Sequence, residues 1–303
     1  MAKQNLAFMY GRVSKNPIIS RDEETGEYNY GLLYLDTVRG LRSVDDDVNF
    51  VKHDHPLIMS REKEICDKMA DWKENDIIFV KGVITSKKLL KPSYCPHCTD
   101  ENGMATKNDS YGNLLFVTPI YAEKVKEESD KKLAQEDVVL HREISNQVFI
   151  YGHVLKEPKL FITKQKVRIC QYPIAINRKF TIRTDDPSIK TDWPIVKSYG
   201  KQAIDDKARL DVQSEIIVDG FLQSRRTIRR RKCDNCGRLY DWEDNSMEIV
   251  PYAVEYIKNY KSDHDIEVET QGTVEEYLQS LFEKDNSSSD DLVEGLLTDD
   301  CNS

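Results

Sequence analysis

Apolar and polar residues alternate along several stretches of the C-terminal half of the chain, and this period of two is typical of β-strands. Five strands are expected there, at residues 146–154, 166–177, 192–200, 215–231 and 246–258. The stretch 200–211 between the third and fourth strands has a helical composition instead. Its apolar residues Ala203, Ile204, Ala208 and Leu210 are expected to face a core.

The N-terminal half repeats this layout. NLAFMYGRVSKNPII begins at Asn5 and NQVFIYGHVLKEPKL begins at Asn146, so these two segments align at an offset of 141 residues. IIFVKGVITSKK (77–88) aligns with EIIVDGFLQSRR (215–226) at an offset of 138, with a helix expected at 60–76 in the first unit. The small change of offset is what loops of different length produce, and we infer an internal duplication.

Three strands, a helix and two further strands is the order of an OB-fold, a five-stranded Greek-key barrel. We therefore expect a mainly β protein with two tandem OB-folds and long hairpin loops between their last two strands. The expected domains are a first OB-fold at 1–125, a charged linker at 126–145, a second OB-fold at 146–261 and an acidic tail at 262–303. The tail is expected to be disordered, apart from a short amphipathic helix at 273–284.

The net charge of −9 hides an uneven distribution of charge. Residues 262–303 hold 13 acidic residues and one lysine, whereas residues 146–240 hold 20 basic and 10 acidic residues, a net charge of +10. The second unit is thus basic enough for a polyanionic partner. No apolar run is long enough for a signal peptide or a membrane span, so we expect a cytoplasmic protein without a membrane partner.

Four of the seven cysteines form two Cys-x-x-Cys pairs, Cys95/Cys98 and Cys233/Cys236. The offset of 138 places one pair on the other, so both pairs are expected at the tips of equivalent hairpins. Structural zinc takes four Cys or His ligands, and each pair alone is two ligands short. We expect the four cysteines to complete one structural Zn²⁺ site, either within a chain or across a homodimer. A redox pair is the alternative, but no βαβ context accompanies either pair.

The second unit resembles the bacterial single-stranded DNA-binding protein family. The resemblance rests on YPIAINRKF (172–180), TDWPIVKSYGKQA (191–203) and IIVDGFLQSR (216–225), and it spans about 80 residues. The first unit repeats it in weaker form in GLLYLDTVRG, VNFVKHDHP and KGVITSKK. Two OB-folds in one chain resemble the tandem members of the family. The cysteine pairs and the unusual tail resemble a phage or mobile-element version.

The resemblance implies sequence-independent binding of single-stranded DNA, by bases stacked on aromatic rings beside a basic groove. Trp193, Tyr199 and Phe180 fall at or near the family's stacking positions, whereas Phe149 and Phe161 are expected to pack in the core. The residues expected to meet phosphates are Arg178, Arg225, Arg226, Arg229, Arg230, Arg231 and Lys232. In the first unit, which is expected to bind more weakly, the candidates are Lys87, Lys88, Tyr34 and Phe50.

The function expected from these residues is non-catalytic coating of strands exposed in DNA replication, recombination, repair or transfer, near the nucleoid. Acidic tails in the family recruit replication and recombination proteins, although this chain ends LLTDDCNS without the family's usual Pro-Phe ending. The alternative is a protein–protein scaffold of such an assembly, in which contact with nucleic acid is incidental. Within the sequence, no paired-carboxylate, His-rich or Gly-rich phosphate motif supports an enzyme.

Overall fold

The computed structural model describes residues 4–40, 51–184 and 186–270. Its N-terminal unit is a closed five-stranded barrel, with strand order β1-β3-β5-β7-β6-β1 and one parallel pair, β5–β7. The strands of this barrel are β1 (Asn5–Val13), β3 (Tyr28–Val38), β5 (Leu57–Ser60), β6 (Ile77–Thr99) and β7 (Ala105–Lys126). Two short strands extend β3, namely β2 (Ile18–Arg21) and β4 (His53–Asp54), and α1 (Lys63–Ala70) precedes β6.

The C-terminal unit repeats this topology with strand order β8-β10-β12-β14-β13-β8 and a parallel pair β12–β14. Its strands are β8 (Asn146–Val154), β10 (Arg168–Asn177), β12 (Ile195–Tyr199), β13 (Leu210–Lys232) and β14 (Leu239–Tyr260). The further elements are β9 (Lys159–Ile162), β11 (Thr191–Asp192), α4 (Gly200–Arg209) and α5 (Asp263–Thr270). Two barrels with the same closed order confirm the mainly β fold class with tandem OB-folds.

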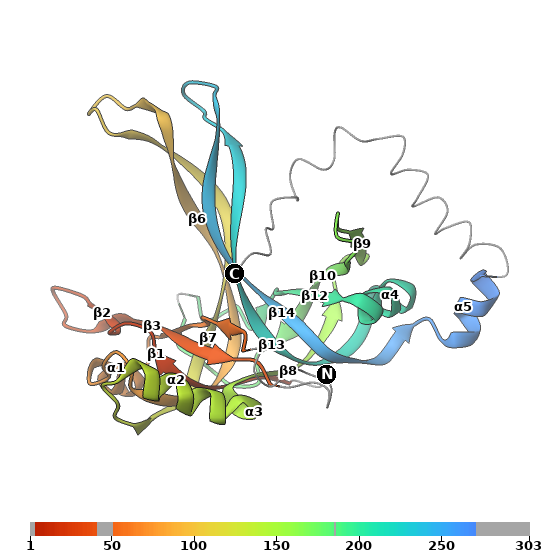
Figure 1. Cartoon of the computed structure of the whole chain (residues 1–303), viewed down its shortest axis with the longest axis horizontal. Coiled ribbons are helices and arrows are strands. Elements are labelled where there is room, and N and C mark those ends of the chain that lie inside the picture. The colour runs from red at the N-terminus through yellow and green to blue at the C-terminus, as the bar shows by residue number, and fades with distance from the viewer. Residues whose placement is uncertain (1–3, 41–50, 185, 271–303) are drawn as a thin grey trace.

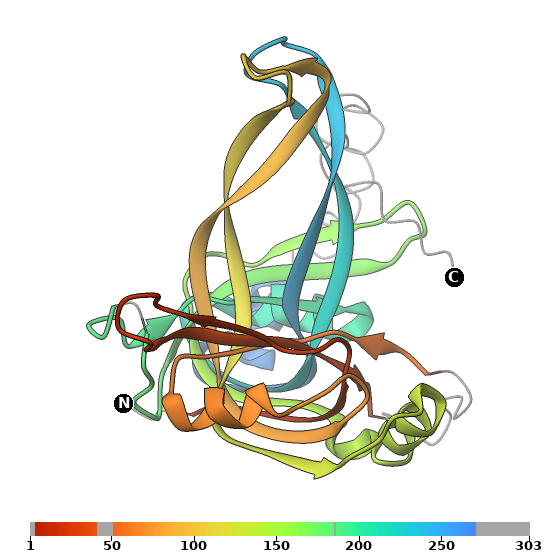
Figure 2. The same ribbon diagram turned by 90° about the vertical axis from the view of Figure 1, so that its left-hand side faces the viewer.

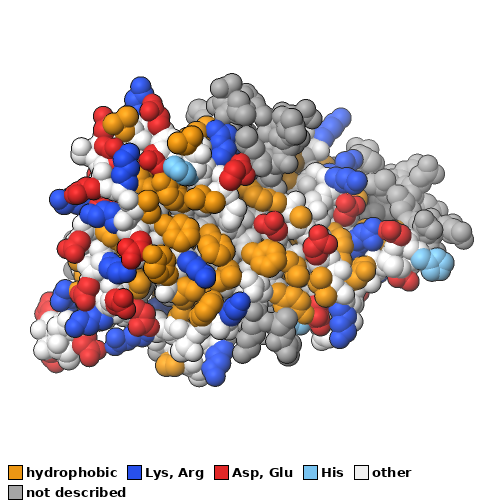
Figure 3. Space-filling view, turned by 90° about the horizontal axis from the view of Figure 1, so that it is seen from below, with side chains coloured by type: hydrophobic (Ala, Val, Ile, Leu, Met, Phe, Trp, Pro, Cys, Tyr) orange, Lys and Arg blue, Asp and Glu red, His pale blue; other side chains and the backbone are white. Residues whose placement is uncertain are grey.

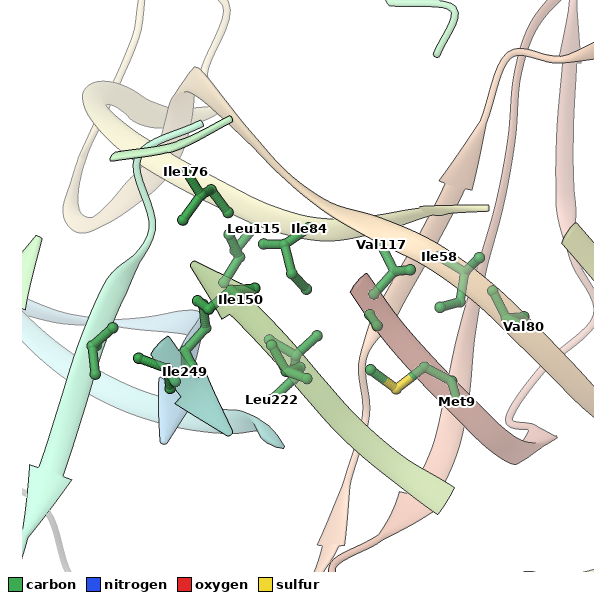
Figure 4. Packing of buried hydrophobic residues seen from close by; sticks show 14 of the residues in the cluster. Met9, Ile58, Val80, Ile84, Leu115, Val117, Ile150, Ile176, Leu222 and Ile249 are labelled. Carbon is green, nitrogen blue, oxygen red and sulfur yellow. The ribbon is translucent and has the colours of Figure 1, made fainter. Parts of the chain in front are cut away.

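The two barrels share one sheet. The first strand of each unit pairs antiparallel with the other, from Asn5 opposite Ile150 to Met9 opposite Asn146. One buried cluster fills both barrels, and Figure 4 shows Met9, Ile58 and Val117 of the first unit in the same cluster as Ile150, Leu222 and Ile249 of the second. The units are therefore one packed body.

Residues of the expected linker form α2 (Lys131–Leu140) and α3 (Arg142–Ser145). The Asp130 carboxylate caps α2 by accepting hydrogen bonds from the backbone N–H groups of Lys132 and Leu133. The helix buries Ala134 and Val138 against the first barrel, where the Tyr10 hydroxyl donates to Asp137 at 2.6 Å. This segment is thus docked along its length on the barrel that precedes it.

The helix α4 corrects one expectation about the core. Ala203 and Leu210 are buried as expected, but Ile204 is 38 % exposed, and the buried residue one turn from Ala203 is Asp206. Asp206 is tolerated inside because the hydroxyls of Tyr172 and Tyr256 and the amide of Gln202 donate to its carboxylate. Burial raises the pKa of Asp206 despite these hydrogen bonds. A pattern of apolar residues alone does not reveal an acid on the inner face.

Candidate nucleic-acid interface and metal centre

The last two strands of each barrel continue beyond it as long hairpins, which rise together and meet at their tips (Figures 1 and 2). In the first hairpin Tyr94 lies opposite Lys107, and in the second Lys232 lies opposite Leu239. The two hairpins touch through side chains on their facing sides. The Lys91 ammonium reaches Asp244 and the Asn245 carbonyl, and the hydroxyls of Ser93 and Tyr240 lie 2.7 Å apart.

All four cysteines of the two Cys-x-x-Cys pairs gather where the hairpin tips meet, with their sulfur atoms within 4.8 Å of one another. The shortest contacts between hairpins join Cys95 to Cys236 at 3.8 Å and Cys98 to Cys233 at 3.7 Å. The expected single cluster shared by the two units, within one chain, is thus confirmed.

The cluster fits a thiolate-bound metal ion. Cys95 and Cys233 are buried and Tyr240 packs beside them, so two ligand atoms are shielded from solvent. Hydrogen bonds from the backbone N–H groups of Cys236 and Asn235 lower the pKa of Cys233 to about 6, and the thiolate is the form that binds metal. Gly237 follows this knuckle with φ of 71°, a left-handed conformation that glycine adopts at no steric cost. His97 is exposed and is not one of the four clustered residues.

The basic run before the second knuckle is paired with acids of its own hairpin. Arg229 reaches Asp244 at 2.9 Å, Arg230 reaches Asp241 at 3.0 Å and Arg231 reaches Asp234 at 3.0 Å. Arg226 pairs with Glu243, and Arg225 lies 3.5 Å from Glu248. Exposed ion pairs are weak, so a phosphate can compete for these guanidinium groups. Lys232 is exposed near the tip.

The aromatic candidates differ in exposure. Trp193 is 47 % exposed between β11 and β12, and its backbone N–H donates to Ser86 Oγ of the first unit at 2.9 Å. Tyr199 and Phe180 are half-buried, and Arg225 donates to the Tyr199 hydroxyl. Tyr34 is 49 % exposed in the first unit, whereas Phe50 lies outside the described residues. The expectation that Phe149 and Phe161 pack in the core is wrong, since both rings are exposed.

Arg178 is committed to a buried contact between the two units. It forks onto Asp192 at 2.6 and 2.9 Å, and Asp192 accepts from the backbone N–H of Ser86. The first unit reciprocates at the equivalent place, where Arg39 forks onto Asp54 and Asp54 accepts from the backbone N–H of Ser224. These reciprocal anchors fix the base of each hairpin to the other barrel.

Two exposed rings on the first hairpin escaped the sequence reasoning. Tyr111 and Tyr94 are 73 % and 59 % exposed on the side of the hairpin away from the cysteine-bearing face, and Leu90 lies opposite Tyr111. The Lys88 ammonium sits 4.7 Å from the centre of the Tyr111 ring. The alternation of Leu90 and Tyr94 with Lys91, Ser93 and Cys95 was the available signal. Lys87 is exposed on the same strand.

A charged cluster next to the Asp54 anchor titrates in an informative way. Burial raises the pKa of Asp36, but hydrogen bonds from His53 and Arg12 outweigh it and hold this pKa at about 2. The hydrogen bond to Asp36 raises the pKa of His53 above its ordinary value. The charged His53–Asp36 pair is therefore complete only while His53 carries its proton.

Protonated His53 should stabilise the fold at mildly acid pH. Its contribution is full below the unfolded-state pKa of about 6.5 and is lost as pH rises through the raised folded value. The share of Asp36 behaves oppositely, because it is present above pH about 4 and lost as pH falls toward 2. We expect His53→Gln to lower the melting temperature at pH 6 by a few degrees and to change it less at pH 8.5. His264→Gln is the control, and an equal loss at both pH values would contradict the assignment.

Among the described residues, the four cysteines are the one group of three or more Cys, His, Asp or Glu side chains placed to hold a metal ion. None of the helices described is long and apolar enough to cross a membrane.

Comparison with known proteins agrees with the topology. Residues 145–235 match the Single-strand binding protein family. A deletion variant of the single-stranded DNA binding protein from Thermus aquaticus covers 87 % of this chain and all of its own length, with 14 % identity and a TM-score of 0.52. The wild-type form of that protein covers 86 % of this chain and 97 % of its own, with 14 % identity and a TM-score of 0.49. No curated protein matches the chain.

Proposed function

We propose, with the single-strand binding family match of residues 145–235 as the premise, that this chain binds single-stranded DNA without strong sequence preference. The observation that carries the proposal is the exposed indole of Trp193, which lies inside the matched segment. Its backbone is held by Ser86 of the other unit, so the ring is presented in a fixed place at little entropic cost. Stacking of a base on such a ring is worth roughly 1–3 kcal/mol and tolerates any base.

The proposed path of the strand continues from Trp193 past Tyr199 and Arg225 onto β13. There Arg226, Arg229, Arg230, Arg231 and Lys232 would meet phosphates by exchanging their carboxylate partners. Arg178 is left out of this surface, because its guanidinium is 8 % exposed and engaged with Asp192. In the first unit, Lys88 with Tyr111 and Tyr94 offers an exposed ring-and-lysine surface, beside the earlier candidates Lys87 and Tyr34.

The finer assignments are part of the same proposal. The cysteine cluster would hold structural Zn²⁺, because four thiols and no carboxylate suit a soft tetrahedral ligand set. A non-catalytic role in replication, recombination, repair or transfer would place the protein at the nucleoid, with the acidic tail as the contact for partner proteins. The scaffold alternative predicts no salt-dependent strand binding, so the same titration separates the two functions.

The test is fluorescence anisotropy of a labelled homopolymeric strand against a labelled duplex, at several salt concentrations. We expect tight binding to the strand only, with log affinity falling by about 0.7 per phosphate contact for each unit of log salt. Trp193→Ala should weaken binding by roughly 1–3 kcal/mol and leave the slope unchanged, while Trp193→Phe keeps most of the affinity. Equal affinity for duplex would reject the proposal.

The paired acids call for a matched control of the basic run. Arg230→Gln lowers the charge of the hairpin, whereas Arg230→Gln with Asp241→Asn removes the pair and keeps the net charge. If Arg230 meets a phosphate, both variants should bind more weakly and show a shallower salt slope. If only net charge matters, the double variant should bind like the wild type, and Arg230 would leave the contact surface.

A further inference from the structure

The shared sheet has an outer face that neither barrel covers. Its six strands lie in the order β7-β6-β1-β8-β13-β14, and alternate residues point away from the core. The inward residues Ala7, Met9, Val148 and Ile150 are fully buried, whereas their neighbours on the outer face are not. The outer residues form an apolar patch across the junction of the barrels: Leu6, Phe8, Phe79, Tyr121, Phe149 and Ile217.

Figure 3 shows this face from below, with hydrophobic side chains gathered over its centre and charged side chains around them. Phe149 is 41 % and Tyr121 is 46 % exposed. An exposed cluster of large rings on a regular sheet is costly in water and typically marks an interaction surface. The patch lies on the far side of β1 and β8 from the core (Figures 3 and 4), so it is separate from the hairpins.

The patch has an internal two-fold pattern that breaks in one informative place. Phe8 and Phe149 are equivalent in the duplication, and they flank the junction at neighbouring positions of β1 and β8. Across from Phe8 on the next strand lies Lys81, and across from Phe149 lies Asp219. The two barrels therefore carry opposite charges at equivalent sites of the face. Within the described part of the chain, no ion pair joins either side chain.

We propose that two copies of this chain pack face to face through this sheet, with the first barrel of each copy over the second barrel of its partner. A face with two-fold character is suited to an isologous contact, in which the same patch serves both copies. Two sheets pack about 10 Å apart with their rings interdigitated, which removes the exposed patch from water.

The charges select the orientation of the two copies. A two-fold axis in the plane of the interface can run along either of two perpendicular directions. One direction places Lys81 opposite the partner's Asp219, twice over by symmetry. The other places Lys81 opposite the partner's Lys81 and Asp219 opposite the partner's Asp219. Like charges held face to face at an interface cost several kcal/mol, so the first arrangement is favoured.

The inference stands apart from strand binding, and it is tested on the full chain without DNA. Sedimentation velocity over a range of concentrations should show a dimer for the wild type. Phe149→Asp should give a monomer, since it places a carboxylate at the centre of the patch. Lys81→Asp and Asp219→Lys should each weaken dimerisation at least about tenfold, because each creates facing like charges. The double variant Lys81→Asp with Asp219→Lys restores both contacts and should recover the dimer.

Lys159→Asp, a reversal at an exposed lysine of β9, is the matched control and should leave the dimer unchanged. Circular dichroism shows that each variant is folded. A monomeric wild type at all concentrations would overturn the proposal. Single reversals that dimerise like the wild type would also overturn it, since the other axis presents like charges in every case.

Discussion

Replacing Cys233 with Ser is expected to abolish stoichiometric metal binding and to separate the tips of the two hairpins. The cluster takes two thiols from each hairpin, and its short contacts all run from one hairpin to the other. A metal ion at this place would therefore join two segments that are far apart in the chain, and loss of one ligand would break that join. Because structural zinc and local folding are coupled, the tips should loosen together.

Metal analysis of the purified protein is the first measurement, and about one zinc per chain is expected for the wild type. Hydrogen exchange at the tips, around Ser93 and Tyr240, should accelerate in Cys233→Ser and after treatment with a chelator. Cys301→Ser is the control, because it removes a thiol that the cluster does not contain. Two zinc ions per chain would mean that each knuckle is completed separately, and a protein that binds none would reject the site.

Asp192→Ala is expected to cost about 3–5 kcal/mol of unfolding free energy, the usual loss when one partner of a buried ion pair is removed. The Asp192 side chain is fully buried and Arg178 is 8 % exposed, so the guanidinium would remain inside without a counter-charge. The backbone N–H of Ser86 would lose its acceptor as well. The variant should also bind single strands more weakly, because the neighbouring Trp193 depends on the same contact with Ser86.

Urea denaturation measures the loss, and the duplication supplies a matched second site. Asp54→Ala removes the equivalent anchor of the first unit and should cost a similar amount, whereas Asp186→Ala in an exposed turn should cost little. Arg178→Met combined with Asp192→Leu should be less harmful than Asp192→Ala alone, because no charge is left buried. A cost for Asp192→Ala below that of Asp186→Ala would show that the anchor does not hold the barrels together.

The sequence was sufficient for features that repeat or alternate. The offset of 138 residues placed one cysteine pair on the other, and a duplicated barrel then required equivalent hairpins, so the shared cluster followed from the chain alone. The strand order of each unit followed from the period of two. Both rest on local patterns that survive folding unchanged.

What the sequence did not reveal depends on register and on the packing of one unit against the other. Arg178 was expected on the DNA surface, but its partner Asp192 and the Ser86 backbone meet it only once the barrels are joined. Phe149 was expected in the core, yet it points to the outer face, because β8 is a sheet strand with its core-facing side at Val148 and Ile150. The carboxylates that pair with the arginines of β13 are set by the hairpin register, which places Arg230 opposite Asp241.

The pairing of β1 with β8 has a consequence for the order in which the ribosome delivers the chain. Residues Asn5–Met9 take their partner from residues 146–150, so this edge of the nascent first barrel stays open until nearly half of the chain has been made. Open strand edges are templates for pairing between chains, and the hazard lasts as long as translation of the intervening segment. The docking helix α2 emerges just before β8 and is already fixed to Tyr10 on β1, so it delivers β8 directly to the waiting edge. Slow codons between α2 and β8 would therefore prolong exposure at the point where the chain can least afford an intermolecular encounter.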